Sequence, residues 1–496
     1  QAQHAIDGMS FYPEEARAWF RGIIDWLQDW PCARRTGLGT PLPWSKDWIV
    51  ETLSDSTVYM AYYMISKFVN GGRVKSEQLT PETLDYIFYG TGKVDELSKT
   101  VGMERGLLDE IRNEFLYWYP VDLRNSGKDL VGNHLSFCIF QHVALFEQRY
   151  WPRAFGVNGF MVLEGKPIHK SQGNFIPLWK ACEQQGADAV RCTVLLAAEG
   201  MDDPDWRADN IRDVRNRLES FIHRVEEVST RPNEKSSNGH LENWLLSKVA
   251  ARAQLVSEAV EKLKTRTAAA AALYDLWNDL RWYERRIAKP DSATMREFVS
   301  SWIRLLTPFA PHMAEEAWKK LGEAGFAASA EWPKFDQVTV DTKSDELESL
   351  IRQTLNDTQE IIATTKLSPK KVHYYTAAKW KWRVYNEALT RFNANPETLD
   401  GLIRDMISAK AASVKDLPKF ASKVIQQVRT MPADLRTRRL EAGEVDERGL
   451  FAQAQAFFSK ELKTTVEVHS EDEPSIYDPK SRARMAEPYR PAIFLE

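Results

Sequence analysis

The spacing of hydrophobic residues changes along the chain, and the first 205 residues mix two patterns. Residues 14–30 place apolar side chains every three or four positions, which predicts an amphipathic helix. A second helix is expected to start near Asp55, because aspartate is a favoured N-cap residue. Short apolar runs at 115–123 and 159–163 are strand candidates that alternate with helices. Residues 1–205 are therefore predicted to form an α/β domain with a parallel sheet.

Beyond this region the helical period takes over. Residues 206–335 repeat apolar side chains at helical spacing and are predicted to form an all-α helical bundle. The polar stretch 231–240 is expected to be a loop inside that bundle, because helical periodicity resumes after it. Residues 336–496 are predicted to form a small α+β domain, with strands at 370–377, 464–469 and 492–496.

Composition narrows the class of protein. The chain has 496 residues, so several domains are expected, and its formal net charge of -4 means that contact with nucleic acid has to come from local basic patches. Its four cysteines are scattered without paired spacing, which argues against a disulfide framework or a zinc knuckle and favours a reducing compartment. A cytoplasmic protein is expected, and no stretch has the length of a membrane span.

Two segments carry candidate chemistry. In the first, a strand is expected to end before Ser126-Gly127 and a helix to start near Asn133; Gly127 then allows close approach to a nucleotide, and Asp129 can accept hydrogen bonds from ribose hydroxyls. The alternative is a plain strand-to-helix turn with Asp129 as a capping or solvated residue. The second segment is a loop after residue 165, which offers a lysine, a hydroxyl and a glycine to polyphosphate, or forms an ordinary polar turn; its residues are Lys170, Ser171, Gly173 and Asn174.

Several motifs, taken together, resemble one enzyme family. SGKDLVGNHL followed by EGKPIHKSQGN resembles the class I aminoacyl-tRNA synthetases, and QQGADAVRCTVLLAAE with LLTPFAPHMAEEAW is similar to their leucyl, isoleucyl, valyl and methionyl subgroup. CARRTGLGTPLPW, ETLSDSTVYMAYY and the closing RPAIFLE resemble the leucyl type of archaea and of the eukaryotic cytosol. The resemblance implies a multidomain fold: a partial Rossmann-type nucleotide-binding half, then the helical bundle, then the α+β C-terminal domain.

The resemblance also implies roles for single residues. Lys170 and Ser171 match the fourth and fifth positions of the family's KMSKS loop and are the expected catalytic residues. The implied substrates are ATP with Mg²⁺, leucine and tRNA(Leu). Residues matching nucleotide-contacting positions are Gly127, Asp129, His134, Lys170, Gly173 and Asn174. The leucine pocket is implied to contain Leu53 and Ser56, supported by Asp55.

The sequence also departs from the family. Pro167, Ile168 and His169 stand where the family has Lys, Met and Ser, and Lys166 is a candidate replacement for the first loop lysine. No HIGH motif is present, and the chain starts where the family's editing domain ends. We therefore expect the C-terminal half of a leucine–tRNA ligase that is inactive without an N-terminal half carrying HIGH and the editing domain, and that has no zinc site of its own. A catalytically inactive tRNA-binding paralogue is the alternative.

Basic residues mark candidate RNA contacts. Between Arg404 and Arg439 there are nine Lys or Arg residues against three acidic ones, an excess that fits phosphate binding or a solvated helix face. Trp380 and Trp382, interleaved with basic residues, could stack on bases or be buried. The residues expected to contact tRNA are Arg212, Arg215, Lys419, Lys423, Arg436, Arg438 and Arg439.

Overall fold

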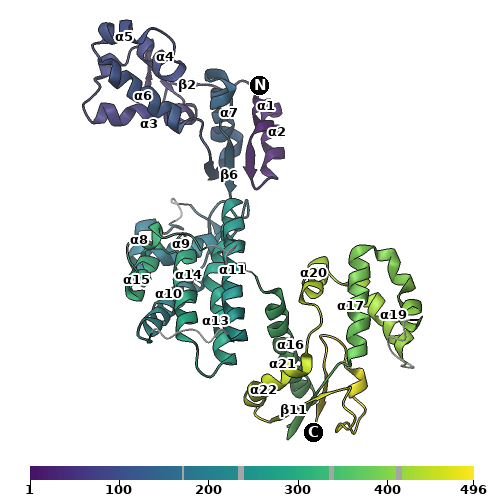
Figure 1. The fold of residues 1–496 in the computed structure, drawn as a ribbon. Helices are drawn as coiled ribbons and strands as arrows, with labels where there is room; N and C mark the ends of the chain where they lie inside the picture. Colours follow the sequence, from purple (N-terminus) through teal and green to yellow (C-terminus); the bar gives the residue numbers. More distant parts are fainter. Residues whose placement is uncertain (170–172, 233–238, 334–339, 409–415) are drawn as a thin grey trace. The chain divides into compact units, whose positions relative to one another are not determined.

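The computed structural model describes residues 1–169, 173–232, 239–333, 340–408 and 416–496 (Figure 1). The chain divides into two compact units. The first comprises Gln1–Glu219 with Val256–Ala270, and the second comprises Ser220–Leu255 with Ala271–Glu496. Among the described helices, none is both long enough and apolar enough to cross a bilayer.

The first unit contains a three-stranded parallel sheet in the order β1-β6-β5. Its strands are β1 (Ser10–Tyr12), β6 (Ala154–Asn158) and β5 (Arg124–Gly127). The first four residues of β6 are buried, as expected for a central parallel strand covered on both faces. The core beside the sheet is closed by α1 (Ala2–Gly8), α2 (Ala16–Trp26) and α7 (Ser136–Leu145). The sheet confirms the predicted Rossmann-type half. The helix expected at 14–30 is present as α2, which spans Ala16–Trp26.

A helical subdomain of the first unit corrects one strand prediction. Its helices are α3 (Thr52–Asn70), α4 (Pro81–Tyr89), α5 (Val94–Val101) and α6 (Arg105–Trp118). The strand expected at 115–123 is wrong, because α6 continues to Trp118 and the nearby strand β5 starts at Arg124. Leu108, Ile111 and Phe115 form a buried stripe at helical spacing, and that stripe outweighs the aromatic composition of the run.

Two further expectations in this unit need correction. The helix expected near Asp55 starts at Thr52, because the Glu51 side chain accepts a hydrogen bond from the Leu53 N–H and caps it. The run at 159–163 is not a covered strand: β7 is only Val162–Leu163, and Phe160 is exposed. The buried strand before the predicted loop is β6. The remaining elements of the unit are β2 (Ala33–Arg34), β3 (Pro41–Leu42), β4 (Ser45–Val50), β8 (Lys166–Pro167), β9 (Asp205–Trp206), α8 (Leu178–Gln185), α9 (Ala187–Ala197) and α12 (Thr265–Ala270).

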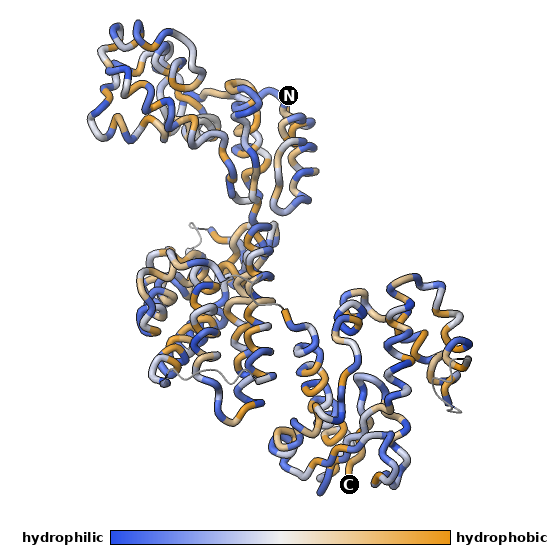
Figure 2. Tube along the Cα trace, viewed as in Figure 1, coloured by the Kyte–Doolittle hydropathy of each residue, from blue (hydrophilic) through white to orange (hydrophobic). Residues whose placement is uncertain are grey.

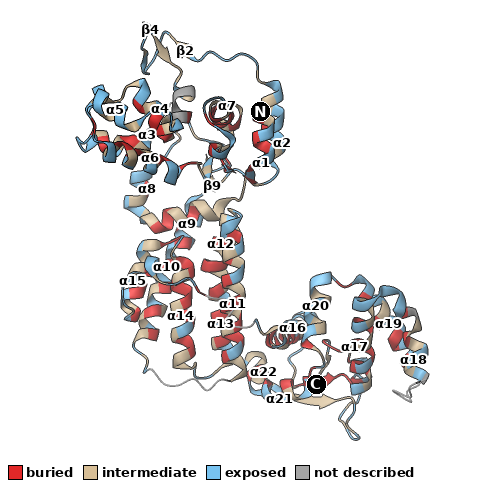
Figure 3. Ribbon diagram, turned by 45° about the horizontal axis from the view of Figure 1, so that its top comes forward, coloured by how far each residue is buried: buried red, intermediate tan, exposed pale blue. Residues whose placement is uncertain are grey.

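The second unit begins with the predicted helical bundle. Phe221, Phe298 and Trp302 pack their rings together in its core. Figure 3 shows buried residues on the inner sides of these helices, and Figure 2 shows hydrophobic and hydrophilic residues alternating along them. Residues 233–238 of the expected loop lie outside the described residues. The helices are α10 (Ala208–Ser229), α11 (His240–Glu261), α13 (Leu276–Arg286), α14 (Ser292–Leu306) and α15 (Pro311–Leu321), of which α10 and α11 start or end in the first unit.

The rest of the second unit is α+β, as predicted. All three strands expected from the sequence are present: β10 (Lys371–Thr376), β11 (Thr465–Ser470) and β12 (Ala492–Leu495). They form a sheet in the order β11-β10-β12, with β10 parallel to β11 and antiparallel to β12. The domain boundaries at 205 and 335 stay predictions. The helices are α16 (Thr342–Thr365), α17 (Lys379–Ala394), α18 (Leu402–Ser408), α19 (Leu417–Thr430), α20 (Ala433–Ala442), α21 (Glu447–Gln453) and α22 (Gln455–Leu462).

Candidate functional site

The strands of the parallel sheet all end at one edge of the first unit. A cavity of about 860 Å³ opens there, lined by Tyr12 at the end of β1 and by Asn158 and Gly159 at the end of β6. Gly200 and Met201, from the segment after α9, close another side. Ligands of open parallel sheets bind beyond the carboxyl ends of the strands, so this edge is the candidate site.

The end of β5 brings Gly127 and Asp129 together. The Asp129 carboxylate lies against Gly127, so a side chain at position 127 would displace this carboxylate from the strand end. Asp129 is exposed in the short helix Lys128–Leu130 and is free to face solvent. Lys128 points elsewhere: its Nζ lies 2.7 Å from Asp203 Oδ1 and 3.2 Å from the Met201 carbonyl oxygen. The hydrogen bond from Lys128 lowers the pKa of Asp203.

The end of β6 lies against the same segment. The Gly159 N–H donates to the Gly200 carbonyl (3.2 Å), and the Phe160 N–H donates to Asp203 Oδ1 (2.6 Å). A Cβ at Gly159 would run into the carbonyl group of Asp202. The ends of β5 and β6 therefore both bind to residues 200–203, and this segment lines the cavity.

Substitution of Gly159 tests this close approach. We expect Gly159→Ala to destabilise the first unit by about 1 to 3 kcal/mol, because the new methyl group overlaps backbone that cannot swing aside. Gly106→Ala in α6 is the matched control: no heavy atom lies within 4 Å of its added Cβ, so stability should stay level or rise slightly. Differential scanning calorimetry of the two variants makes the comparison, and equal midpoints would contradict the packing described.

His134 is buried behind the edge rather than open to it. One ring nitrogen contacts the Arg124 guanidinium, and the ring also hydrogen-bonds the Leu53 backbone at the start of α3. Burial, and then the positive charge of Arg124, lower the pKa of His134, which favours the neutral imidazole. The structure thus brings together a residue expected to bind nucleotide and one expected to line the leucine pocket. The side chains of Asp55 and Ser56 lie outside the described part of the chain.

The predicted phosphate loop is described only at its two flanks. His169 and Asn174 form an antiparallel bridge, and Asn174 Nδ2 donates to the Pro167 carbonyl (2.8 Å). Gly173 has φ of +67°, a left-handed conformation that favours glycine. The GN tail therefore closes the loop on itself. Lys170 and Ser171 lie outside the described residues, so their catalytic roles stay predictions.

The side chains expected to contact tRNA differ in their exposure and in their ion pairs. Arg212 and Arg215 are exposed on α10 and pair with acids of their own helix, Asp209 and Glu219. On α19, Lys423 pairs with Glu487, whereas the exposed Lys419 has no ion pair within the described ranges. Lys419 is the cation of this group that is best placed to meet a phosphate.

Three other candidate arginines face the protein. Arg436 lies over the Phe392 ring (4.5 Å), and Arg438 Nε lies 3.0 Å from Glu346 Oε1. Arg439 donates to the Tyr385 hydroxyl (2.8 Å) and its side chain is largely buried. Trp382 is also buried, which favours a packing role over stacking on bases.

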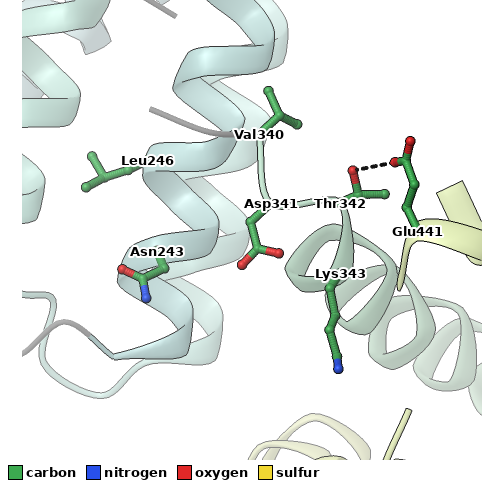
Figure 4. Close-up of a pocket in the computed structure, with 7 residues that line it drawn as sticks. All are labelled: Asn243, Leu246, Val340, Asp341, Thr342, Lys343 and Glu441. Carbon is green, nitrogen blue, oxygen red and sulfur yellow. Dashed lines mark hydrogen bonds between the residues drawn. The ribbon is translucent and has the colours of Figure 1, made fainter. Parts of the chain in front are cut away.

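A second cavity, of about 540 Å³, lies inside the second unit at the start of α16 (Figure 4). Asp341 caps that helix through the Ser344 N–H (3.0 Å), and Thr342 Oγ1 donates to Glu441 Oε2 (3.1 Å). Leu246 and Lys343 point in different directions (Figure 4). Because its polar groups cap a helix and do not converge, the edge of the parallel sheet remains the better candidate site.

Comparison with known proteins agrees with this organisation. Residues 1–207 match the family model of class I tRNA synthetases (I, L, M and V), and residues 242–374 match the anticodon-binding domain of tRNA ligase. The first 207 residues are thus similar to class I tRNA synthetases. The match to the anticodon-binding domain starts inside the helical bundle and ends in β10.

Individual relatives show which tRNA ligases the chain resembles. The chain is 40% identical over 99% of its length to leucine–tRNA ligase of Methanothrix thermoacetophila and 38% identical over its whole length to that of Pyrococcus abyssi. It spans about half the length of these curated relatives, 51% of each. A solved structure of Mycobacterium tuberculosis methionyl-tRNA synthetase with methionyl-adenylate shares 18% identity over 65% of this chain and 60% of that one, at a TM-score of 0.46. That score is too low to support an argument.

Sequence reasoning missed part of the candidate site. Lys128, Gly159 and Asp203 hold the strand ends together, and none was singled out from the sequence. The signal for Gly159 was present, since it directly follows the run Ala154–Asn158 that forms the central strand. The Lys128–Asp203 pair spans 75 positions, so no local pattern could have revealed it.

Proposed function

We propose that this chain is the C-terminal half, or a separate subunit, of a leucine–tRNA ligase. The observation that carries the proposal is its 40% identity, along almost its whole length, to a protein named leucine–tRNA ligase. Since the chain spans about half of that relative, the proposed activity requires an N-terminal half that carries the HIGH motif and the editing domain. Two tryptophans of the first unit, Trp26 and Trp44, are 68% and 81% exposed, which suits a surface covered by that partner.

The proposed reaction has two steps. The leucine carboxylate attacks the α-phosphorus of ATP and expels pyrophosphate, which leaves leucyl-adenylate. A hydroxyl of the terminal ribose of tRNA(Leu) then attacks the carbonyl carbon of leucyl-adenylate, and AMP leaves. Such chemistry needs mainly positioning and neutralisation of charge. ATP, with Mg²⁺ as its counter-ion, and leucine are the small substrates.

The residues at the sheet edge suit the first step. Gly127 allows the chain to approach ATP, and the exposed Asp129 can accept hydrogen bonds from the ribose hydroxyls. Gly173 and Asn174 close the loop in which Lys170 is proposed to neutralise the leaving pyrophosphate, with Ser171 as a second contact. His134 supports this edge from beneath through Arg124 and the Leu53 backbone. Leu53, Asp55 and Ser56 at the start of α3 are proposed to surround the leucine side chain.

Transfer RNA is the proposed macromolecular substrate. The match to an anticodon-binding domain and the exposed cations Arg212, Arg215, Lys419 and Lys423 support contacts with the RNA backbone. Arg436, Arg438 and Arg439 are proposed contacts as well; Arg438 is 45% exposed, whereas the Arg439 side chain is 18% exposed and bonded to Tyr385. A cytoplasmic location is proposed because all four cysteines are free thiols, as expected in a reducing compartment.

Leucine-dependent exchange of pyrophosphate into ATP tests the proposal. The chain alone is expected to give no exchange, and addition of the polypeptide from the same genome that carries the HIGH motif is expected to restore it. Isoleucine, valine and methionine are run in parallel to test the amino-acid specificity. A complex that forms on gel filtration and binds tRNA(Leu), yet exchanges no pyrophosphate, would instead identify an inactive tRNA-binding paralogue.

A further inference from the structure

One face of the small sheet in the second unit gathers side chains that the proposed function does not use. β10 and β11 are parallel neighbours, and His373 on β10 is the register partner of Glu467 on β11. His469 follows Glu467 by two positions, so its side chain leaves the same face of the sheet. These three side chains therefore meet over two adjacent strands, although 94 positions separate His373 from Glu467 along the chain.

The donor atoms of the three side chains form a small triangle. His373 Nδ1 lies 3.1 Å from His469 Nε2 and 3.4 Å from Glu467 Oε2, and His469 Nε2 lies 3.7 Å from that same oxygen. Tetrahedral Zn²⁺ holds nitrogen and oxygen ligands at about 2.0 to 2.2 Å, which requires donor atoms roughly 3.3 to 3.6 Å apart. One side of the observed triangle, 3.4 Å, lies within this range, and the other two, 3.1 and 3.7 Å, lie close to its limits.

Groups behind the triangle orient its members. The far nitrogen of His373, Nε2, lies 3.0 Å from Glu496 Oε2, and the far nitrogen of His469, Nδ1, lies 4.0 Å from Glu473 Oε2. Metal-binding histidines usually donate their second N–H to a carboxylate, and the His373–Glu496 pair has this arrangement. The His469–Glu473 distance is longer than a hydrogen bond. Lys371 Nζ holds the other oxygen of Glu467 at 2.9 Å, which leaves Oε2 for the imidazoles.

Neighbouring rings shield the buried member of the triangle. His373 is 1% exposed, and its ring stacks on that of His469 with the ring centroids 5.4 Å apart. The Tyr477 ring packs against His373 at a tilted angle, with the centroids 5.0 Å apart. These contacts limit the access of bulk water to the His373 imidazole.

We propose that His373, Glu467 and His469 bind a divalent transition-metal ion of the Zn²⁺ class, with water as the fourth ligand. Two imidazoles and one carboxylate select such an ion over Mg²⁺ or Ca²⁺, which prefer oxygen ligands. The ion joins β10 to β11 and, through Glu496, fixes the end of the chain beside β12. Its role is to hold this sheet together, independently of the ligase reaction. The alternative is a metal-free pair of hydrogen-bonded histidines.

Metal titration of the full chain tests the proposal. After dialysis against a chelator, Co²⁺ is added and its visible absorption followed, because tetrahedral Co²⁺ absorbs far more strongly than the hydrated ion. We expect saturation at one Co²⁺ per chain, loss of the band when Zn²⁺ is added, and a higher thermal midpoint with Zn²⁺. A chain that shows no such band and no change in midpoint with Zn²⁺ would overturn the proposal and leave the hydrogen-bonded pair.

Three variants make the test specific. His469→Gln removes one ligand and is expected to abolish the cobalt band, whereas His223→Gln, which changes an exposed histidine on α10, should leave it intact. Glu496→Gln keeps all three ligands but weakens the carboxylate behind His373, and should reduce affinity about 10- to 100-fold. Glu496 is half exposed, so this variant remains informative even if His469→Gln fails to fold. Wild-type affinity in both His469→Gln and Glu496→Gln would refute the site.

Discussion

Replacing Glu348 with glutamine is expected to lower the stability of the second unit by about 3 to 5 kcal/mol, the usual result of leaving one partner of a buried ion pair alone. The Glu348 side chain is 1% exposed and the Arg286 side chain 7%. Arg286 binds the carboxylate with two nitrogens, Nε to Oε2 at 2.8 Å and Nη2 to Oε1 at 3.1 Å. Trp282 Nε1 donates to Oε2 at 2.9 Å, and His240 Nε2 lies 3.2 Å from Oε1. A neutral amide cannot satisfy all four donors.

The same site predicts a dependence on pH. Burial opposes ionisation, but the hydrogen bonds from His240 and Arg286 outweigh it and lower the pKa of Glu348 to about 2, from an ordinary value of 4.5. A group whose pKa is lower in the folded state stabilises the fold above its unfolded pKa. That contribution is lost as the pH falls from 4.5 toward about 2. Glu348→Gln should remove this part of the acid sensitivity.

Urea unfolding of the wild type and the variant, repeated between neutral pH and pH 3, measures both effects. Glu96→Gln is the matched control, because Glu96 forms an exposed pair with Lys93 at 2.9 Å and such pairs contribute about 1 kcal/mol or less. If Glu348→Gln were no more destabilising than Glu96→Gln at pH 7, the account of the buried pair would be wrong.

Local patterns were enough to predict much of the fold. The bundle and strands β10, β11 and β12 lie where the apolar spacing of the sequence predicted them. The error at 115–123 arose where composition and period disagreed. Aromatic residues there favoured a strand, but Leu108, Ile111 and Phe115 already set a helical stripe that only a core on one side explains. The helical spacing of the buried residues therefore predicted this segment better than its aromatic composition did.

The site residues also differ in whether their surroundings are set by local or by distant parts of the chain. Gly127 and Asp129 could be placed at a strand end from sequence, because the turn that joins them is local. The surroundings of Arg439 could not, since Tyr385 lies 54 positions away and only the folded chain shows that the guanidinium is occupied. The His373 and His469 pair escaped notice for the same reason: two strands distant in sequence bring the rings together. Residues whose role depends on distant partners need the structure.

Loss of the Lys170 ammonium is expected to have the largest effect on activity. In the proposed ligase, reconstituted with the proposed N-terminal half, Lys170→Ala should reduce kcat for leucine activation by an amount equivalent to about 2 to 4 kcal/mol, the cost of losing one electrostatic donor to a developing charge. The hydrogen bond from Asn174 to Pro167 and the left-handed Gly173 close the loop that carries this lysine. The KM for leucine should change little, because the proposed contact is to the departing pyrophosphate.

Pyrophosphate exchange and single-turnover formation of leucyl-adenylate distinguish this role from a general loss of charge. Lys180→Ala removes an exposed lysine in the first turn of α8, further along the chain, and should leave kcat unchanged. Lys166→Ala addresses the altered loop: a comparable fall in kcat would mean that Lys166, in β8, shares the charge that the family's first loop lysine provides. Equal activity of Lys170→Ala and Lys180→Ala would remove the proposed chemistry from this loop, because the reaction would then proceed without the cation on which charge neutralisation was argued to depend.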